Sequence, residues 1–279
     1  MWQKINIFVR ANTILSAFLI TVLFLLLTMA AGLPIILRGI VEETIGLPIF
    51  IAYQLILSVI GIFLMKKLQV LDEGDFKFKN ICKGFLLGWV VLLLAALMLV
   101  LNLTSPPEDG FHTPDPLYLL TAILYPFIVA GLFEEVVFRG ILLKILLKKM
   151  GSTKKGITNA ILISAAIFAA AHAIHLIWQP PLTVLSDLIF PTAGGIFLGV
   201  IYLRTKTLIV PILLHGLLNL TTTIFWAITS YGPASVTETT LEGIVMIVLI
   251  AALPLIITAF VLLRKVKPED IAVESNIAK

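Results

Sequence analysis

Runs of about 20 apolar residues recur along the whole chain, and they constrain its fold more than any other feature. A helix needs about 20 mostly apolar residues to cross a bilayer, because each residue advances it by ~1.5 Å. Apolar types make up 59% of the 279 residues and charged types only 13%, whereas soluble domains carry about 25% charged residues. The mean hydropathy is +1.09. Nucleic-acid binding, disorder and coiled coils are excluded, since none of them gives a place to so much apolar surface.

Eight apolar segments are long enough to be membrane spans. They lie at about 13–36, 49–65, 84–103, 117–138, 157–178, 184–203, 207–229 and 241–263. The expected fold class is therefore all-α, a polytopic transmembrane helical bundle of about eight spans. The predicted location is that of a multi-pass integral membrane protein, in the cell membrane if the source is prokaryotic, with the lipid bilayer as its first partner.

The charges between the spans predict an orientation. If the N-terminus is cytosolic, every Lys and Arg except Arg38 falls in a cytosolic segment, and loop acids such as Glu108 and Asp109 fall mostly outside. An excess of Lys and Arg marks the cytosolic side, so both termini are predicted to be cytosolic. We therefore read the net charge of +4 as topology. The single cysteine, Cys82, leaves no internal disulfide and no cysteine-based metal site, and we expect it to pack inside.

Ionisable side chains inside spans are costly and therefore mark candidate functional sites. Span four carries Glu134 and Glu135, followed by Arg139. Glu135 and Arg139 are four residues apart with the acid first, which is the better orientation for a helical ion pair. Glu134 points about 100° away and lacks that partner. We therefore expect Glu135 to be a fixed anion and Glu134 to be the freer base.

Two further polar clusters lie in spans five and seven. Phe168 precedes His172 by four residues, in a run of small residues that permits close helix approach. His215 and Asn219 share one face of span seven. Pro211, one turn earlier, predicts a kink or local opening there.

Helix geometry indicates that the first two clusters can meet. If spans four and five form a hairpin that turns at 151–152, Glu134 and His172 lie within half a turn, or ~3 Å along the axis. Span four must then stay helical to about Leu147, so it either tilts or borders water from the cytosol. His175 stands nearer the outer end of span five and is expected at the membrane interface.

These clusters resemble the motifs of the CPBP family, also called the ABI family, of CAAX proteases and bacteriocin-processing enzymes. The family is marked by Glu-Glu-x-x-x-Arg, Phe-x-x-x-His and His-x-x-x-Asn/Asp on successive membrane helices. Here the motifs are Glu134-Glu135-x-x-x-Arg139, Phe168-x-x-x-His172 and His215-x-x-x-Asn219. The resemblance covers about 134–219 and is to the type of the Ras-converting CAAX endopeptidase. A Gly195-x-x-x-Gly199 face is expected to let span six pack close behind the site.

The resemblance implies three parts of the chain and one activity. The parts are helices 1–3 with their loops at 1–112, a protease core of helices 4–7 at 113–230, and a last helix with a short cytosolic tail at 231–279. The activity is that of an intramembrane endopeptidase. It would cleave membrane-associated protein or peptide substrates, prenylated CAAX-type proteins among them, and it has no nucleic-acid partner.

The resemblance also implies roles for the residues. Glu134 and His172 would activate a water as general base, and His215 and Asn219 would stabilise the oxyanion. The supporting residues are Glu135, Arg139 and Phe168. We expect no cofactor. The alternative is zinc held by Glu134, His172 and His215, although the His-Glu-x-x-His spacing of soluble zinc proteases is absent.

Two alternatives from other function classes stay open. Buried Glu and His also serve transporters and proton relays, which would place polar groups and interrupted helices in both halves of the chain. Here the polar clusters lie in spans four, five and seven only. The other alternative is a non-catalytic bacteriocin-immunity protein that keeps the fold.

Overall fold

The computed structural model describes residues 2–36, 43–104, 110–151, 153–177, 179–229 and 239–267. Every element in these ranges is helical. The elements are α1 (Trp2–Ala11), α2 (Thr13–Ile36), α3 (Glu43–Lys67), α4 (Ile81–Leu87), α5 (Trp89–Thr104), α6 (Pro116–Tyr125), η1 (Pro126–Phe133), η2 (Val136–Leu143), α7 (Lys144–Met150), α8 (Lys154–Ala171), η3 (His172–Ile177), α9 (Pro181–Thr205), α10 (Ile209–Ala227), α11 (Leu241–Met246), η4 (Ile247–Ala252) and α12 (Leu253–Leu263). Arg38, Glu108 and Asp109, which contribute to the predicted orientation, lie outside the described residues, as does most of the tail.

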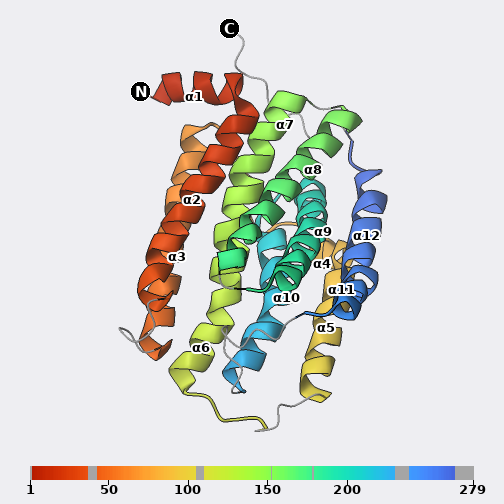
Figure 1. Cartoon of the computed structure of the whole chain (residues 1–279). Coiled ribbons are helices and arrows are strands. Elements are labelled where there is room, and N and C mark those ends of the chain that lie inside the picture. The colour runs from red at the N-terminus through yellow and green to blue at the C-terminus, as the bar shows by residue number, and fades with distance from the viewer. Residues whose placement is uncertain are drawn as a thin grey trace.

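The predicted all-α membrane bundle is confirmed. Within the described residues, seven helices are long and apolar enough to cross a membrane, and α4 with α5 adds an eighth if the two, bent by 68°, form one span. The share of residues buried inside the protein is 61% for α9 but 28% for α2, α3 and the α11–α12 span. The bundle is therefore built around α9. The helix α1 and the C-terminal end of α12 lie toward the same end of the bundle (Figure 1). That this end faces the cytosol stays a prediction.

Span four is one long helix made of α6, η1, η2 and α7. It runs for 35 residues from Pro116 to Met150, which is ~52 Å at 1.5 Å per residue and exceeds a hydrocarbon core of about 30 Å. Asp115 caps its first turn by accepting hydrogen bonds from two backbone N–H groups. The expected continuation beyond the upright span length is confirmed. Glu134 and Glu135 lie between the π-helical segments η1 and η2, a local geometry that recurs at functional sites.

Small residues let α8 and α9 pack closely. A Cβ atom added at Gly195 would lie 3.0 Å from the Cβ of Ala165 and 3.2 Å from the ring of Phe168. Ser164 on α8 donates a hydrogen bond of 3.2 Å to the carbonyl of Phe138 on η2. The close approach that the sequence predicts for this face is therefore confirmed.

Two local predictions are wrong. The helix α10 begins at Ile209, so Pro211 lies in its first turn, where backbone N–H groups have no intrahelical partner in any case. The helix then continues to Ala227 without the expected opening at Pro211. Cys82 is exposed on α4 instead of packing inside.

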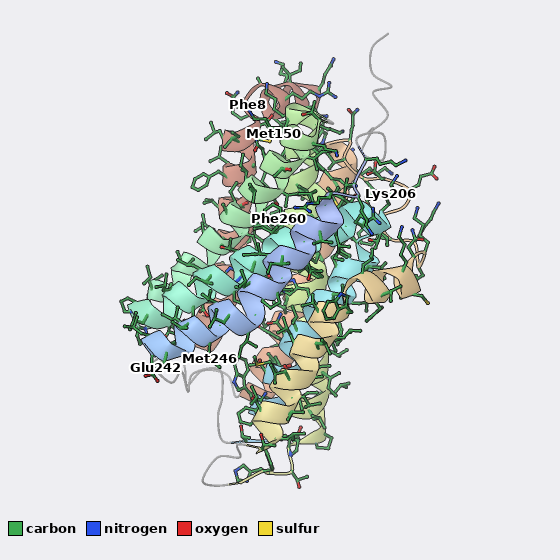
Figure 2. The ribbon with its side chains drawn as sticks, turned by 90° about the vertical axis from the view of Figure 1, so that its right-hand side faces the viewer. Phe8, Met150, Lys206, Glu242, Met246 and Phe260 are labelled. Atoms are coloured by element: carbon green, nitrogen blue, oxygen red, sulfur yellow. The ribbon has the colours of Figure 1, made fainter. Side chains whose placement is uncertain are left out.

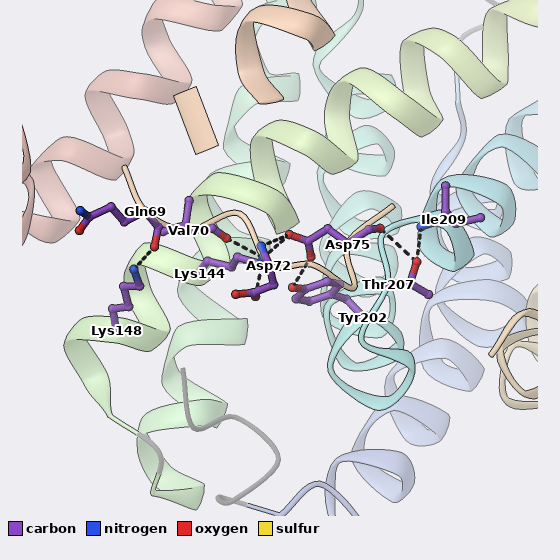
Figure 3. Close-up of polar contacts among 9 residues, drawn as sticks. All are labelled: Gln69, Val70, Asp72, Asp75, Lys144, Lys148, Tyr202, Thr207 and Ile209. Carbon is purple, nitrogen blue, oxygen red and sulfur yellow. Dashed lines mark hydrogen bonds and ion pairs between the residues drawn. The ribbon is translucent and has the colours of Figure 1, made fainter. Parts of the chain in front are cut away.

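A polar cluster attaches the loop between α3 and α4 to three other helices (Figure 3). The Nζ atom of Lys144 on α7 lies 2.7 Å from an oxygen of Asp72 and 2.5 Å from Oδ2 of Asp75. The other carboxylate oxygen of Asp75 accepts a hydrogen bond of 2.9 Å from the hydroxyl of Tyr202 on α9, and its backbone carbonyl accepts one from the N–H of Leu208, just before α10. We call this group the loop clamp. Lys144, one of the cations that the sequence assigns to the cytosolic side, is buried.

Candidate active site

Glu135 and Arg139 form a buried ion pair on span four. Nη1 of Arg139 lies 2.5 Å from Oε1 of Glu135, and the two residues are only 1% and 0% exposed. Nη2 of Arg139 also donates to the carbonyl of Gly195 at 3.3 Å, and the guanidinium carbon lies 4.8 Å from the centre of the Phe168 ring. The predicted i,i+4 pair is confirmed, and it joins span four to both α8 and α9.

His215 of α10 lies between the two glutamates. Its Nδ1 is 2.8 Å from Oε1 of Glu135, and its Nε2 is 3.8 Å from Oε2 of Glu134. An ionised carboxylate only accepts hydrogen bonds, so the hydrogen between His215 and Glu135 belongs to Nδ1. The other ring nitrogen, Nε2, faces Oε2 of Glu134 at 3.8 Å, which is beyond a direct hydrogen bond, and a water beside the two groups can contact both.

Glu134 is held less firmly than Glu135. The side chain of Glu134 is 24% exposed, whereas that of Glu135 is fully buried. Within the described residues, the carboxylate of Glu134 makes no hydrogen bond of ordinary length and has only the longer contact with His215. The arrangement has the asymmetry that the sequence predicts, with one fixed and one freer glutamate.

The ring of Phe168 packs against both histidines. Its centre lies 5.0 Å from that of His172 and 6.0 Å from that of His215, with the rings edge to face in both cases. Nδ1 of His172 lies 3.0 Å from the carbonyl oxygen of Phe168, which places the Nδ1 hydrogen in that bond and leaves Nε2 able to accept a proton. Among the described residues, no hydrogen bond or ion pair joins His172 to Glu134. In the structure, Glu134 therefore lies near His215, whereas His172 lies beside Phe168.

Asn219 lies one turn after His215 on α10. Its Nδ2 donates a hydrogen bond of 3.1 Å to the backbone carbonyl of His215. A side-chain amide carries two N–H donors, so the second one can serve another acceptor.

A polar pair that no sequence motif indicates continues the site beyond His172. Nδ1 of His175 lies 2.9 Å from Oδ2 of Asp187 on α9, and the two side chains are 30% and 31% exposed. The ring of His175 packs edge-on against that of His172, with 5.6 Å between their centres. Asp187 lies in the first third of α9. Only the packing of η3 against α9 brings the pair together.

The site residues as arranged do not fit a zinc centre. Within the described part of the chain, no three His, Cys, Asp or Glu side chains converge as ligands of a metal ion would. The zinc alternative needs Glu134, His172 and His215 around one point. His172 instead uses one ring nitrogen on a backbone carbonyl and packs its ring on Phe168.

Residues 116–221 match the family model described as type II CAAX prenyl endopeptidase, Rce1-like. Over this segment the chain is similar to the CAAX protease family. The matched segment is 106 of the 279 residues and contains all three motifs and every predicted site residue, so the resemblance is confirmed. A comparison with curated proteins gave no match. With its long apolar helices, the protein is a multi-pass integral membrane protein.

Proposed function

We propose that this protein is an intramembrane endopeptidase that hydrolyses a peptide bond in membrane-associated proteins, and that prenylated CAAX-type proteins are its substrates. The observation that carries the proposal is the position of His215, which is held by Glu135 through one ring nitrogen and faces Glu134 with the other. A carboxylate and an imidazole thus lie close enough for one water beside them to contact both, among membrane helices where ionisable groups are costly unless they serve a function.

The first step is the attack of water on the scissile carbonyl. The water donates a hydrogen bond to Oε2 of Glu134 and accepts one from Nε2–H of His215, which in this step carries a hydrogen on both ring nitrogens and is the imidazolium between two carboxylates. As its oxygen bonds to the carbonyl carbon, its proton passes to Glu134. His172, with Nε2 able to accept a proton, assists as the second base from the side of Phe168.

The second step is the stabilisation and collapse of the tetrahedral intermediate. Nε2–H of His215 and the second N–H of Asn219 donate to the oxyanion, and each well-placed donor contributes about 10²–10³ in kcat. Collapse breaks the carbon–nitrogen bond, and the proton taken from water passes to the leaving amine. Glu135 holds His215 in place throughout, because its Oε1 accepts hydrogen bonds from both Arg139 and His215.

Replacement of the proposed base tests the function. We expect Glu134→Gln to lower cleavage of a prenylated CAAX peptide by the purified protein by ~100-fold or more, because general-base catalysis contributes 10²–10⁴. The matched control is Glu73→Gln, which removes an acid whose side chain is 95% exposed and lies on the loop after α3, and it should keep full activity. Both variants should show the unfolding temperature of the parent protein.

Two results would count against the proposal in different ways. Undiminished cleavage by Glu134→Gln would remove Glu134 from the mechanism. Absence of cleavage of prenylated peptides by the parent protein, together with cleavage of other membrane-associated peptides, would keep the protease and refute the substrate class. The product of each reaction is identified by its mass.

A further inference from the structure

A small cavity with three cationic side chains in its lining lies where α4, α9 and the end of α12 meet. Its volume is about 120 Å³, and it is lined by Asn80, Lys83, Leu203, Arg204, Lys206 and Val266. Arg204 is fixed there, because its Nη1 donates to the carbonyl of Lys265 at 2.6 Å and its own carbonyl accepts from Nζ of Lys83 at 3.2 Å. Its Nε atom is buried and has no hydrogen-bond partner among the described residues. The cavity thus offers several N–H donors and positive charge.

A second, larger cavity shares one lining residue, Val266, with the first. Its volume is about 280 Å³, and its apolar lining includes Ile157 of α8 together with Phe260 and Leu263 of α12. Lys154 and Arg264 stand at its edge. In Figure 2, Lys206 near the end of α9 and Phe260 on α12 lie toward the same end of the bundle. None of the residues that line either cavity is acidic.

We infer that the two cavities form one binding site for an anionic phospholipid. The phosphate occupies the cationic cavity around Arg204, and part of an acyl chain occupies the apolar one against Phe260. Charge favours this ligand, since five cations and no acid are among the residues that line the two cavities. Basic pockets between membrane helices on the cytosolic side, where our predicted orientation places these cations, are typical sites for anionic lipid head groups.

The position favours a lipid over the end of a peptide substrate. Ile157 lies near the start of α8 and Ala171 at its end, next to His172, so ~21 Å of helix separates the apolar cavity from His172. The apolar cavity lies between α8 and α12, and the α11–α12 span has only 28% of its residues buried inside the protein. An acyl chain can therefore reach it from the bilayer.

The test measures lipid binding to the delipidated full-length protein in a neutral detergent by native mass spectrometry. We expect phosphatidylglycerol to bind and phosphatidylcholine not to bind. The double variant Lys83→Gln with Lys206→Gln should weaken the binding of phosphatidylglycerol about 30-fold, because each cation near a membrane surface raises the affinity for an anionic lipid by a factor of ~5. The matched control, Lys66→Gln with Lys149→Gln, neutralises two exposed cations of neighbouring helix ends that line neither cavity. It should leave binding unchanged.

A second variant tests the acyl-chain part without touching the cations. Thr158→Trp fills the apolar cavity. It should weaken the binding of phosphatidylglycerol and leave any binding of inorganic phosphate unchanged. Equal loss in the Lys66/Lys149 control would show unspecific attraction and overturn the proposal. The proposal would also be overturned if inorganic phosphate bound more tightly than phosphatidylglycerol and Thr158→Trp had no effect. A third contrary result is displacement of the lipid by a CAAX peptide but not by the same peptide with a carboxyl-terminal amide.

Discussion

The loop clamp offers a test in which two carboxylates share one ammonium group. Nζ of Lys144 lies within 2.7 Å of both Asp72 and Asp75, but the side chain of Asp72 is 57% exposed and that of Asp75 only 1%. Asp75 also accepts hydrogen bonds from Tyr202 and from the backbone N–H of Asp72. The contacts with Lys144 are nearly equal in length, so burial is what distinguishes the two acids.

We expect Asp75→Ala to lower the free energy of unfolding by about 3–5 kcal/mol, because it leaves the buried ammonium of Lys144 without its buried counterion. Asp72→Ala should cost less than about 1 kcal/mol, since water screens an exposed ion pair. Lys144→Met should lower the free energy of unfolding as much as Asp75→Ala does, because it leaves the buried carboxylate of Asp75 without its counterion. Combining Lys144→Met with Asp75→Ala should recover part of the loss, because an apolar replacement of a buried pair removes the desolvation penalty.

The assay is reversible unfolding of the purified variants in mixed detergent micelles, followed by circular dichroism and extrapolated to zero denaturing detergent. Equal losses for Asp72→Ala and Asp75→Ala would refute the reasoning, since burial would then not control the strength of the pair. A double variant as unstable as the sum of the single ones would refute the coupling between Asp75 and Lys144. Activity gives an independent readout, because the clamp also holds Leu208 at the start of the helix that carries His215.

Three further predictions concern the site and its support. Gly195→Ala should lower the stability by about 1–3 kcal/mol in a thermal unfolding assay, since its methyl group would meet Ala165 and Phe168. The control Gly194→Ala, whose methyl group would have nothing within 4 Å, should leave the stability unchanged. Equal losses of stability would contradict the packing. Asn219→Ala should lower kcat by about 10²–10³ with a smaller effect on KM, as expected for an oxyanion donor, and an unchanged kcat would remove it from that role. Cleavage should persist in the presence of a chelator with no stoichiometric zinc in elemental analysis; loss of activity that zinc restores would establish the metal form instead.

Local features of the chain were predictable because short-range rules govern them. Span lengths follow from apolar runs, and the Glu135–Arg139 pair follows from i,i+4 spacing on one helix. The contact of Gly195 with Ala165 follows from small residues on facing helices. Even these rules miss the π-helical segments around Glu134, since a helix register shift leaves no clear mark in residue types.

The sequence alone determined that the chain is a helical membrane protein with motifs that resemble those of CAAX proteases, and it named the residues to examine. Only the tertiary structure decided which of them meet: His215 between two glutamates, His175 beside Asp187 and Asp75 on Lys144. The physical reason is that a residue's chemistry and its helix face are local properties. The partner that satisfies a buried polar group is instead set by how distant helices pack, and a lysine that looks like a boundary marker in the sequence can be the centre of a buried cluster in the fold.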